Sequence, residues 1–180
     1  MKMFSEERKL KTDQLLLTAP VKVFDIVLGK FLSTFLVLAI SVGITLLYFV
    51  FLKFYGNPAV IQSLIGYLGI LLYGAMLISI GMFISTLTQN QIISAISTLA
   101  ILGVLSFIEG FTLDFTGFFN GNLLFIGKFL NGAVDFLAIN VRFYDFAKGI
   151  LNFVPLVYFL SITALFILLT ARVIERRRWR

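Results

Sequence analysis

Between Phe54 and Ile108 the sequence reads FYGNPAVIQSLIGYLGILLYGAMLISIGMFISTLTQNQIISAISTLAILGVLSFI. This stretch contains no Asp, Glu, Lys or Arg, and its only ionisable groups are tyrosine phenols. An α-helix needs about 20 apolar residues to cross the hydrocarbon layer of a membrane, so the stretch is too long for one crossing and long enough for two. The polar run TQNQ at residues 88–91 divides it, and we therefore expect membrane helices over residues 61–87 and 92–108.

Two further windows without charge lie on either side of this stretch. Residues 31–52 form the first, and a Gly-Asn-Pro turn signal follows at residues 56–58. Residues 149–171 form the second, which ends at Arg172. The four windows predict an all-α fold, an integral membrane helical bundle with four transmembrane helices in a single domain, residues 1–180.

Composition supports the same class of protein. Hydrophobic residues make up 59% of the 180 residues and charged residues 13%, whereas soluble domains carry about 25% charged residues. A chain of this length cannot bury so much apolar surface in one aqueous core, so lipid is the expected solvent of the fold. The sequence has no Cys and no His, which removes disulfides, thiolate metal sites and the commonest general base. We therefore expect no enzyme activity, and no cofactor or metal bound to this chain.

The net charge of +6 comes from basic residues that crowd the two ends of the chain, beside the apolar windows. Anionic lipid headgroups lie at that level, so we expect membrane lipid and not nucleic acid as the partner of these charges. Lys and Arg also collect on the cytoplasmic flanks of membrane helices, which predicts that both chain ends lie in the cytoplasm. These basic residues are Lys2, Arg8, Lys9, Lys11, Lys22 and Lys30 in the first segment and Arg172, Arg176, Arg177, Arg178 and Arg180 in the last.

Residues 109–148 join the third and fourth windows and are expected outside the cell, since their few basic residues are offset by acidic ones. Apolar residues recur there at three- and four-residue spacing: Phe125, Ile126, Phe129, Leu130, Val134 and Leu137. This spacing favours an external re-entrant or interfacial helical element. An ordinary loop packed on the bundle is the alternative.

The N-terminal segment, residues 1–30, is the only sizeable candidate for contact with a soluble partner. Thr12 or Asp13 can cap a short helix, and Pro20 prevents its continuation. The result is an amphipathic helix at the membrane surface, with leucines that offer an apolar contact. On the pattern alone, an interfacial anchor helix without a partner is the simpler interpretation.

The energy source of any transport must lie on another chain. The expected spans contain no acidic or basic side chain, which disfavours a proton-driven transporter and a channel or carrier that works alone. The sequence also lacks the Gly-x-x-x-x-Gly-Lys-Ser/Thr phosphate loop that binds ATP. If the protein moves a solute, the ATPase is a separate subunit.

One pattern in the N-terminal segment consists of Glu6-Glu7-Arg8-Lys9, Thr12, Leu15-Leu16-Leu17-Thr18-Ala19-Pro20-Val21 and Gly29-Lys30. It resembles the ABC-2 family of ABC transporter permeases, in which this stretch contains the coupling helix that contacts the ATPase subunit. The resemblance implies that ATP and Mg²⁺ bind to that partner. The pattern departs from the family at Lys11 and Gln14, where Gly and Glu are usual, and neither change abolishes a capped helix. The residues expected to couple to the ATPase are Glu6, Glu7, Arg8, Thr12, Gln14, Leu15, Leu16, Leu17 and Pro20.

The resemblance extends to residues 87–91 and 170–179, which look like the bacterial branch that includes gliding-motility-associated permeases. It implies a permease subunit of an ATP-driven exporter that pairs with a second permease, homo- or heterodimeric. Six-helix permeases of this family have two more membrane helices before the coupling segment, so the chain is expected to correspond to the C-terminal two-thirds. A truncated or regulatory membrane-helix protein without transport activity of its own is the alternative. The family's substrates range from lipids to polysaccharides and drugs, so the resemblance implies no particular substrate.

Small residues are expected to bring the helices together, because lipid and leucine are equally apolar and close backbone approach supplies the attraction. A substrate path along the same face is the alternative role. The candidates are Ala39 and Gly43 in the first window, Gly74, Gly81 and Ser85 in the second, and Ser94, Ala95 and Thr98 in the third.

Overall fold

The computed structural model describes residues 22–56, 59–107, 132 and 139–178, and side chains up to residue 176. Over these residues the fold consists of α-helices and contains no strand. The helices are α3 (Val23–Tyr55), α4 (Val60–Leu87), α5 (Gln91–Phe107), α8 (Ile139–Ala147) and α9 (Phe153–Arg178). The all-α class expected from the sequence is therefore confirmed for the described part of the chain.

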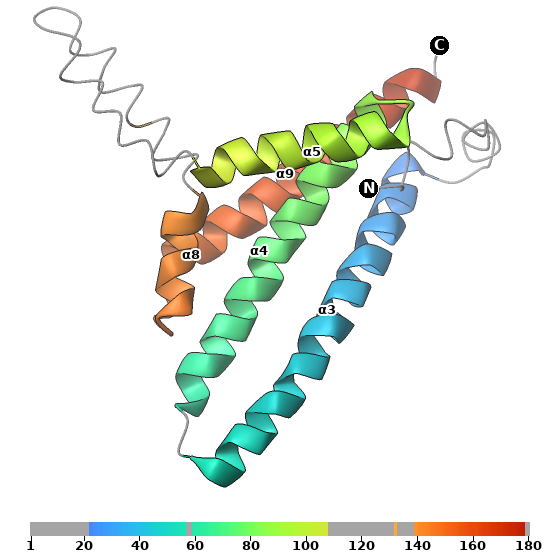
Figure 1. The fold of residues 1–180 in the computed structure, drawn as a ribbon. Coiled ribbons are helices and arrows are strands. Elements are labelled where there is room, and N and C mark those ends of the chain that lie inside the picture. Colours follow the sequence, from blue (N-terminus) through green and yellow to red (C-terminus); the bar gives the residue numbers. More distant parts are fainter. Residues whose placement is uncertain (1–21, 57–58, 108–131, 133–138, 179–180) are drawn as a thin grey trace, which may run out of the picture.

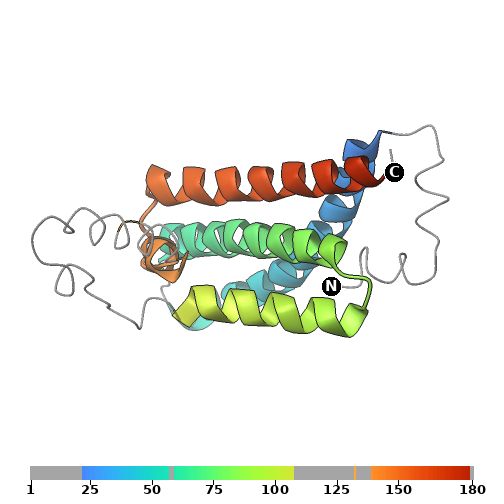
Figure 2. The same cartoon turned by 90° about the horizontal axis from the view of Figure 1, so that it is seen from above.

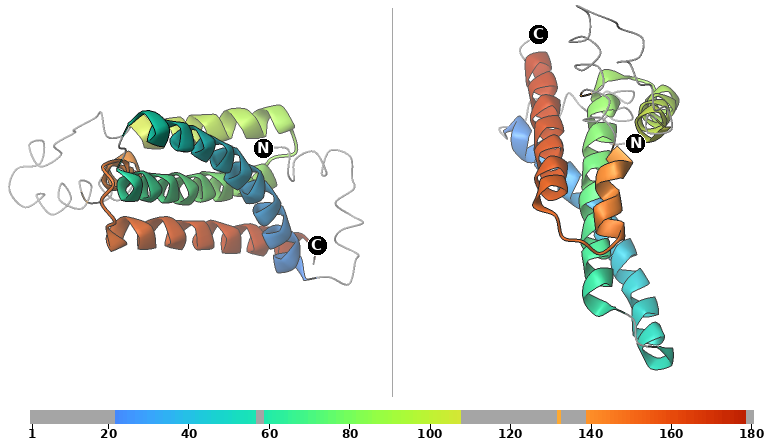
Figure 3. Two further views of the ribbon diagram at one scale, coloured as in Figure 1. Left: turned by 90° about the horizontal axis from the view of Figure 1, so that it is seen from below. Right: turned by 90° about the vertical axis from the view of Figure 1, so that its left-hand side faces the viewer.

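Helix α4 is the centre of the bundle and contacts α3, α5, α8 and α9. Figure 1 shows α3 and α4 as two long helices side by side, with the end of α3 at Tyr55 near the beginning of α4 at Val60. Seen from above, α5, α4 and α9 lie side by side, and α3 passes obliquely beneath them (Figure 2). The short helix α8 lies beside α4, and α3 and α4 extend past it at the end where Tyr55 and Val60 lie (Figure 3).

Helices α3, α4 and α9 are long and apolar enough to cross a membrane. Helix α3 has 33 residues and α4 has 28, which at 1.5 Å per residue is about 50 Å and about 42 Å, against a hydrocarbon core of about 30 Å. Helix α5 is equally apolar but has 17 residues, about 26 Å. Three of the four expected spans thus have the necessary length, and the described part of α5 is slightly short of it.

The expected start of the first span, Phe31, differs from the observed start of the helix at Val23. Asp25 lies in the first turn, where the positive end of the helix dipole favours a carboxylate, and the helix continues through Lys30. A charge-free window marks the part of a helix that suits hydrocarbon, and the helix itself begins eight residues before this window.

The expected start of the last span, Gly149, differs from the observed start of the helix at Phe153, because Gly149 terminates α8. The N–H of Ile150 donates to the carbonyl of Asp145 (2.9 Å) and the N–H of Gly149 to that of Phe146 (2.9 Å), the two bonds of a Schellman motif. Gly149 has φ +74°, the left-handed conformation that this motif requires. Helix α9 then begins at Phe153, where the side-chain oxygen of Asn152 accepts the N–H of Val154 (3.2 Å) as an N-cap.

Two clusters of buried side chains hold the helices together, and α4 contributes to both. The first joins the N-terminal half of α3 to α4 and the C-terminal half of α9: Val23, Val27, Phe31, Ala75, Met82, Ile167 and Ala171. The second joins α4 to α8 and the N-terminal half of α9: Met76, Ile80, Ile84, Ile139, Phe146, Tyr158 and Phe159. The first cluster is called the α3–α9 joint below.

Beyond Phe31, helix α3 turns large apolar side chains outward. Val37 is 65% exposed and Phe51 is 64% exposed, although both lie in a charge-free run. A soluble protein hides such a face, whereas a membrane helix presents it to lipid hydrocarbon or to another helix.

Candidate functional site

The residues expected to couple to an ATPase, Glu6 to Pro20, lie outside the described residues. The chain from this segment enters the bundle at Lys22, which is the N-cap of α3. The beginning of α3 and the end of α9 therefore form the candidate functional site, since whatever acts on the N-terminal segment reaches the bundle there.

The α3–α9 joint packs the beginning of α3 tightly against its neighbours. Val27 is fully buried, and Val23 and Phe31 are each 8% exposed. On the facing helices, Ala171 of α9 and Met82 of α4 belong to the same cluster. Because densely packed side chains transmit displacement instead of absorbing it, a shift of the first turns of α3 must also move the end of α9.

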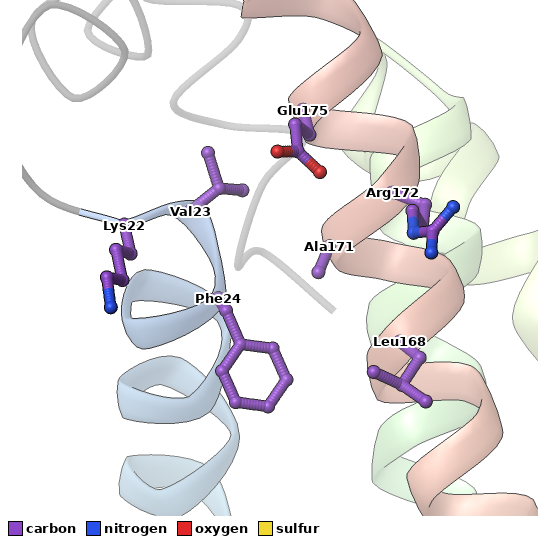
Figure 4. A pocket seen from close by; sticks show the side chains of 7 residues that line it. All are labelled: Lys22, Val23, Phe24, Leu168, Ala171, Arg172 and Glu175. Atoms are coloured by element: carbon purple, nitrogen blue, oxygen red, sulfur yellow. The ribbon is translucent and has the colours of Figure 1, made fainter.

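A cavity of about 570 Å³ opens beside this joint, between α3 and α9. Figure 4 shows the Phe24 ring pointing toward the α9 side and the Glu175 carboxylate pointing toward the α3 side. The Lys22 amine and the Arg172 guanidinium extend along the outer sides of their helices (Figure 4). The lining is Lys22, Val23, Phe24, Leu168, Ala171, Arg172 and Glu175, an apolar floor with a charged rim.

The small residues expected to pack helices fall into two groups. Those on α4 and α5 are buried inside the bundle: Gly74, Gly81, Ser85, Ser94 and Thr98. Ala95 is half-buried, and on α3 Ala39 is half-buried and Gly43 is exposed with no atom within 4 Å of an added Cβ. The close approach between α3 and α4 instead involves Gly74 of α4 and Leu38 of α3.

Substitution of Gly74 by side chains of increasing size tests the close contact between α3 and α4. A Cβ at Gly74 would lie 2.9 Å from both methyl carbons of Leu38, which are the far end of a flexible side chain. We expect Gly74→Ala to cost about 1 kcal/mol or less, because Leu38 can rotate, and Gly74→Ile to cost about 1–3 kcal/mol. Thermal unfolding of the detergent-purified chain measures both, and Leu38→Ala should relieve the isoleucine variant. Equal effects in the presence and absence of Leu38 would contradict the contact.

Hydroxyl groups inside the bundle mostly bond to the carbonyls of their own helices. Thr98 donates to the Ser94 carbonyl (2.7 Å), and Ser79 donates to the Met76 carbonyl (2.7 Å). The Ser94 hydroxyl is buried without a hydrogen-bond partner. Because these hydroxyl groups are satisfied within their own helices, contact between the helices depends on how well their side chains fit together.

A second cavity of about 260 Å³ lies where α3, α4 and α5 meet. It is lined by Thr34, Gly81 and Ser85 together with Leu77, Ile78, Met82 and Leu102. Two of the small residues singled out from the sequence, Gly81 and Ser85, thus line an open cavity between these helices. The cavity combines small and hydroxyl side chains with apolar walls.

Sequence reasoning missed the docking of α8. Asn140 bridges two helices, because its side-chain nitrogen donates to the Ser106 carbonyl of α5 (3.0 Å) and its oxygen accepts the Tyr73 hydroxyl of α4 (3.2 Å). Phe146 is fully buried against Gly69, and the Arg142 guanidinium lies 3.9 Å from the centre of the Tyr158 ring. In the sequence, only the glycine at residue 69 indicates that another helix can approach α4 here. The residue that contacts it, Phe146, is far away in sequence.

The described residues contain no group of three or more acidic side chains that could hold a metal ion.

Comparison with protein families gives a match over almost the whole chain. The family described as ABC-2 family transporter protein matches residues 1–179. No curated protein and no solved structure matches the chain. The long apolar helices agree with a multi-pass membrane protein. The chain therefore belongs to the ABC-2 transporter family and is the membrane permease component of an ABC transporter.

Proposed function

We propose that this chain is the membrane-spanning subunit of an ATP-binding cassette exporter, coupled to ATP hydrolysis on a separate ATPase chain. The observation that carries the proposal is the family match over residues 1–179. The absence of a phosphate loop from the sequence supports a separate ATPase, which would hold the ATP and Mg²⁺. The likeness of residues 87–91 and 170–179 to gliding-motility-associated permeases supports a bacterial exporter of that branch.

In this proposal the N-terminal segment receives the motion of the ATPase. Residues 6–20 contact the ATPase, and the chain then continues through Lys22 into α3. The packing of Val23 and Val27 against α9 supports transmission, because a rigid helix carries a displacement at its end along its whole length. The second cavity, beside Gly81 and Ser85, is a suitable place for the transport path to open.

The proposed orientation puts both chain ends in the cytoplasm. Lys22 and Arg172 line one cavity, so the basic flanks of α3 and α9 lie at the same end of the bundle. The bundle would cross the inner membrane of the cell, and α8 would lie near the external face of that membrane. The exposed apolar face of α3 supports contact with lipid and with a second permease subunit.

The test is co-purification of the permease with its ATPase. We expect Leu16→Pro to reduce the recovered ATPase at least tenfold, because proline breaks the helix that makes the contact. Reversal of charge at Glu6 and Glu7 should have the same direction of effect. The matched control is reversal of charge at Asp114, which lies in the segment expected on the opposite side of the membrane.

Two outcomes would remove this mechanism. Unchanged association of the Leu16→Pro variant would exclude the N-terminal segment as the contact. If the wild-type chain recovers no ATPase at all, the truncated or regulatory membrane protein becomes the better description.

A further inference from the structure

We propose that the cavity between the beginning of α3 and the end of α9 binds a phospholipid whose headgroup carries a primary ammonium, as phosphatidylethanolamine does. The ammonium would bond to Glu175, and the flexible side chains of Lys22 and Arg172 would turn from the outer sides of their helices toward the headgroup phosphate. This lipid would lie against the joint through which α3 and α9 move together.

The level of the cavity in the membrane follows from the positions of the charges. Residues 149–171 carry no charge, and Arg172 is the first charged residue after them on α9. Val23 and Ala171 belong to the same packed cluster, so Lys22 lies at the level of Arg172. Arg172 is the first charge after the apolar span of α9 and marks the headgroup region there, and the charged stretch from Lys22 to Lys30 on α3 lies at the same end of the bundle. The cavity therefore opens among lipid headgroups.

Along α9 the lining of the cavity changes from apolar to charged, as expected for a site that binds a molecule with an apolar tail and a charged head. Leu168, Arg172 and Glu175 all line it, and their spacing places them on one face of the helix. Leu168 lies one turn nearer the hydrocarbon layer, and Phe24 is the apolar wall on α3. The glycerol and first acyl carbons would contact these two side chains, while the headgroup reaches the charges. The cavity volume of about 570 Å³ falls within the range of roughly 300–1,000 Å³ typical of ligand sites.

The two positive charges and one negative charge of the lining favour a headgroup that carries both a phosphate and an ammonium. Two cations lie on the outer sides of the cavity, and one carboxylate points into the space between the helices (Figure 4). Phosphatidylglycerol carries the same phosphate, but its glycerol hydroxyls donate only neutral hydrogen bonds to Glu175 and add no positive charge beside the carboxylate. A choline headgroup carries no N–H and cannot donate a hydrogen bond to the carboxylate, whereas a primary ammonium donates charge-assisted bonds.

The experiment is native mass spectrometry of the full detergent-purified chain with phosphatidylethanolamine, phosphatidylcholine or phosphatidylglycerol of identical acyl chains. A charge-assisted hydrogen bond to an exposed carboxylate predicts that the wild type retains the ethanolamine lipid about two- to fivefold better than the choline lipid. Glu175→Gln should abolish this preference, and Lys22→Gln with Arg172→Gln should lower retention of both lipids. All three side chains are exposed, so neutralising them leaves the core intact.

The matched control is Arg176→Gln, which removes a neighbouring exposed charge that does not line the cavity. It should keep the full preference for the ethanolamine lipid. Equal retention of all three lipids by the wild type, a preference that survives Glu175→Gln, or its loss in Arg176→Gln would each overturn the proposal. The readout needs no ATPase and no transport, so the result is independent of the proposed exporter function.

Discussion

Gly69→Ala will lower the thermal stability of the purified chain, because α8 lies directly on this glycine. A Cβ at Gly69 would clash with the Cβ of Phe146 and lie 2.8 Å from its Cγ. The Cβ of Phe146 is fixed to the backbone of α8, and no rotation of the ring moves it. The helices must separate, and overpacking of this kind costs about 1–3 kcal/mol. Thermal unfolding followed by far-UV circular dichroism should show a midpoint lower by roughly 2–12 °C.

The chain offers matched controls for this substitution. A Cβ at Gly43 or at Gly103 would meet no atom within 4 Å, although both are glycines inside apolar helices. Alanine there should leave the midpoint unchanged or raise it slightly, since helix propensity favours alanine. Phe146→Ala is not a rescue, because it keeps the clashing Cβ, whereas Gly69→Ala should add little further loss in a Phe146→Gly background. If Gly69→Ala behaves like Gly43→Ala, α8 does not dock on α4 as described.

Hydrophobic patterning predicted where apolar helices occur, because the absence of charge over about 20 residues has one main physical explanation. The window at residues 61–87 and the helix Val60–Leu87 differ by one residue at the start. The same patterning could not determine which face of a helix packs against other helices and which face is exposed. Gly74 and Gly43 are equivalent in sequence, yet one is buried against Leu38 and the other is exposed. Lipid and protein are both apolar surroundings, so the sequence carries little contrast between the two faces.

The candidate site was only partly predictable for a different reason. Charge placement marked Arg172 as the flank of the last apolar window and Lys22 as one of the basic residues of the N-terminal segment. That both residues line one cavity depends on how α3 and α9 pack, a contact between distant parts of the chain. The bridge from Asn140 to Tyr73 and Ser106 is likewise long-range, and each residue alone is unremarkable in sequence. The coupling residues Glu6 to Pro20 stay a prediction, because they lie outside the described residues.

Gly149→Ala should be the most destabilising small substitution in the connection between α8 and α9. Gly149 has φ +74°, and this left-handed conformation costs a residue with a Cβ about 1–2 kcal/mol. An added Cβ would also lie 2.5 Å from the Cβ and 2.8 Å from the Cα of Gln62 on α4. The Cα belongs to the backbone, so the clash adds about 1–3 kcal/mol. Thermal unfolding should report the combined loss as the largest midpoint decrease of the alanine series.

Two further variants separate the conformational effect from the steric one. Asparagine adopts the left-handed conformation more easily than alanine, so Gly149→Asn should keep the steric clash but reduce the conformational cost. Its thermal unfolding midpoint should lie between those of wild type and Gly149→Ala. Gln62→Ala should not rescue Gly149→Ala, because the Cβ and Cα that cause the clash remain. Gln62→Gly should rescue it in part, beyond the cost of glycine in a helix of about 1 kcal/mol. A stability of Gly149→Ala equal to wild type would mean that the connection is neither left-handed nor held against α4, and the Schellman end of α8 would have to be abandoned.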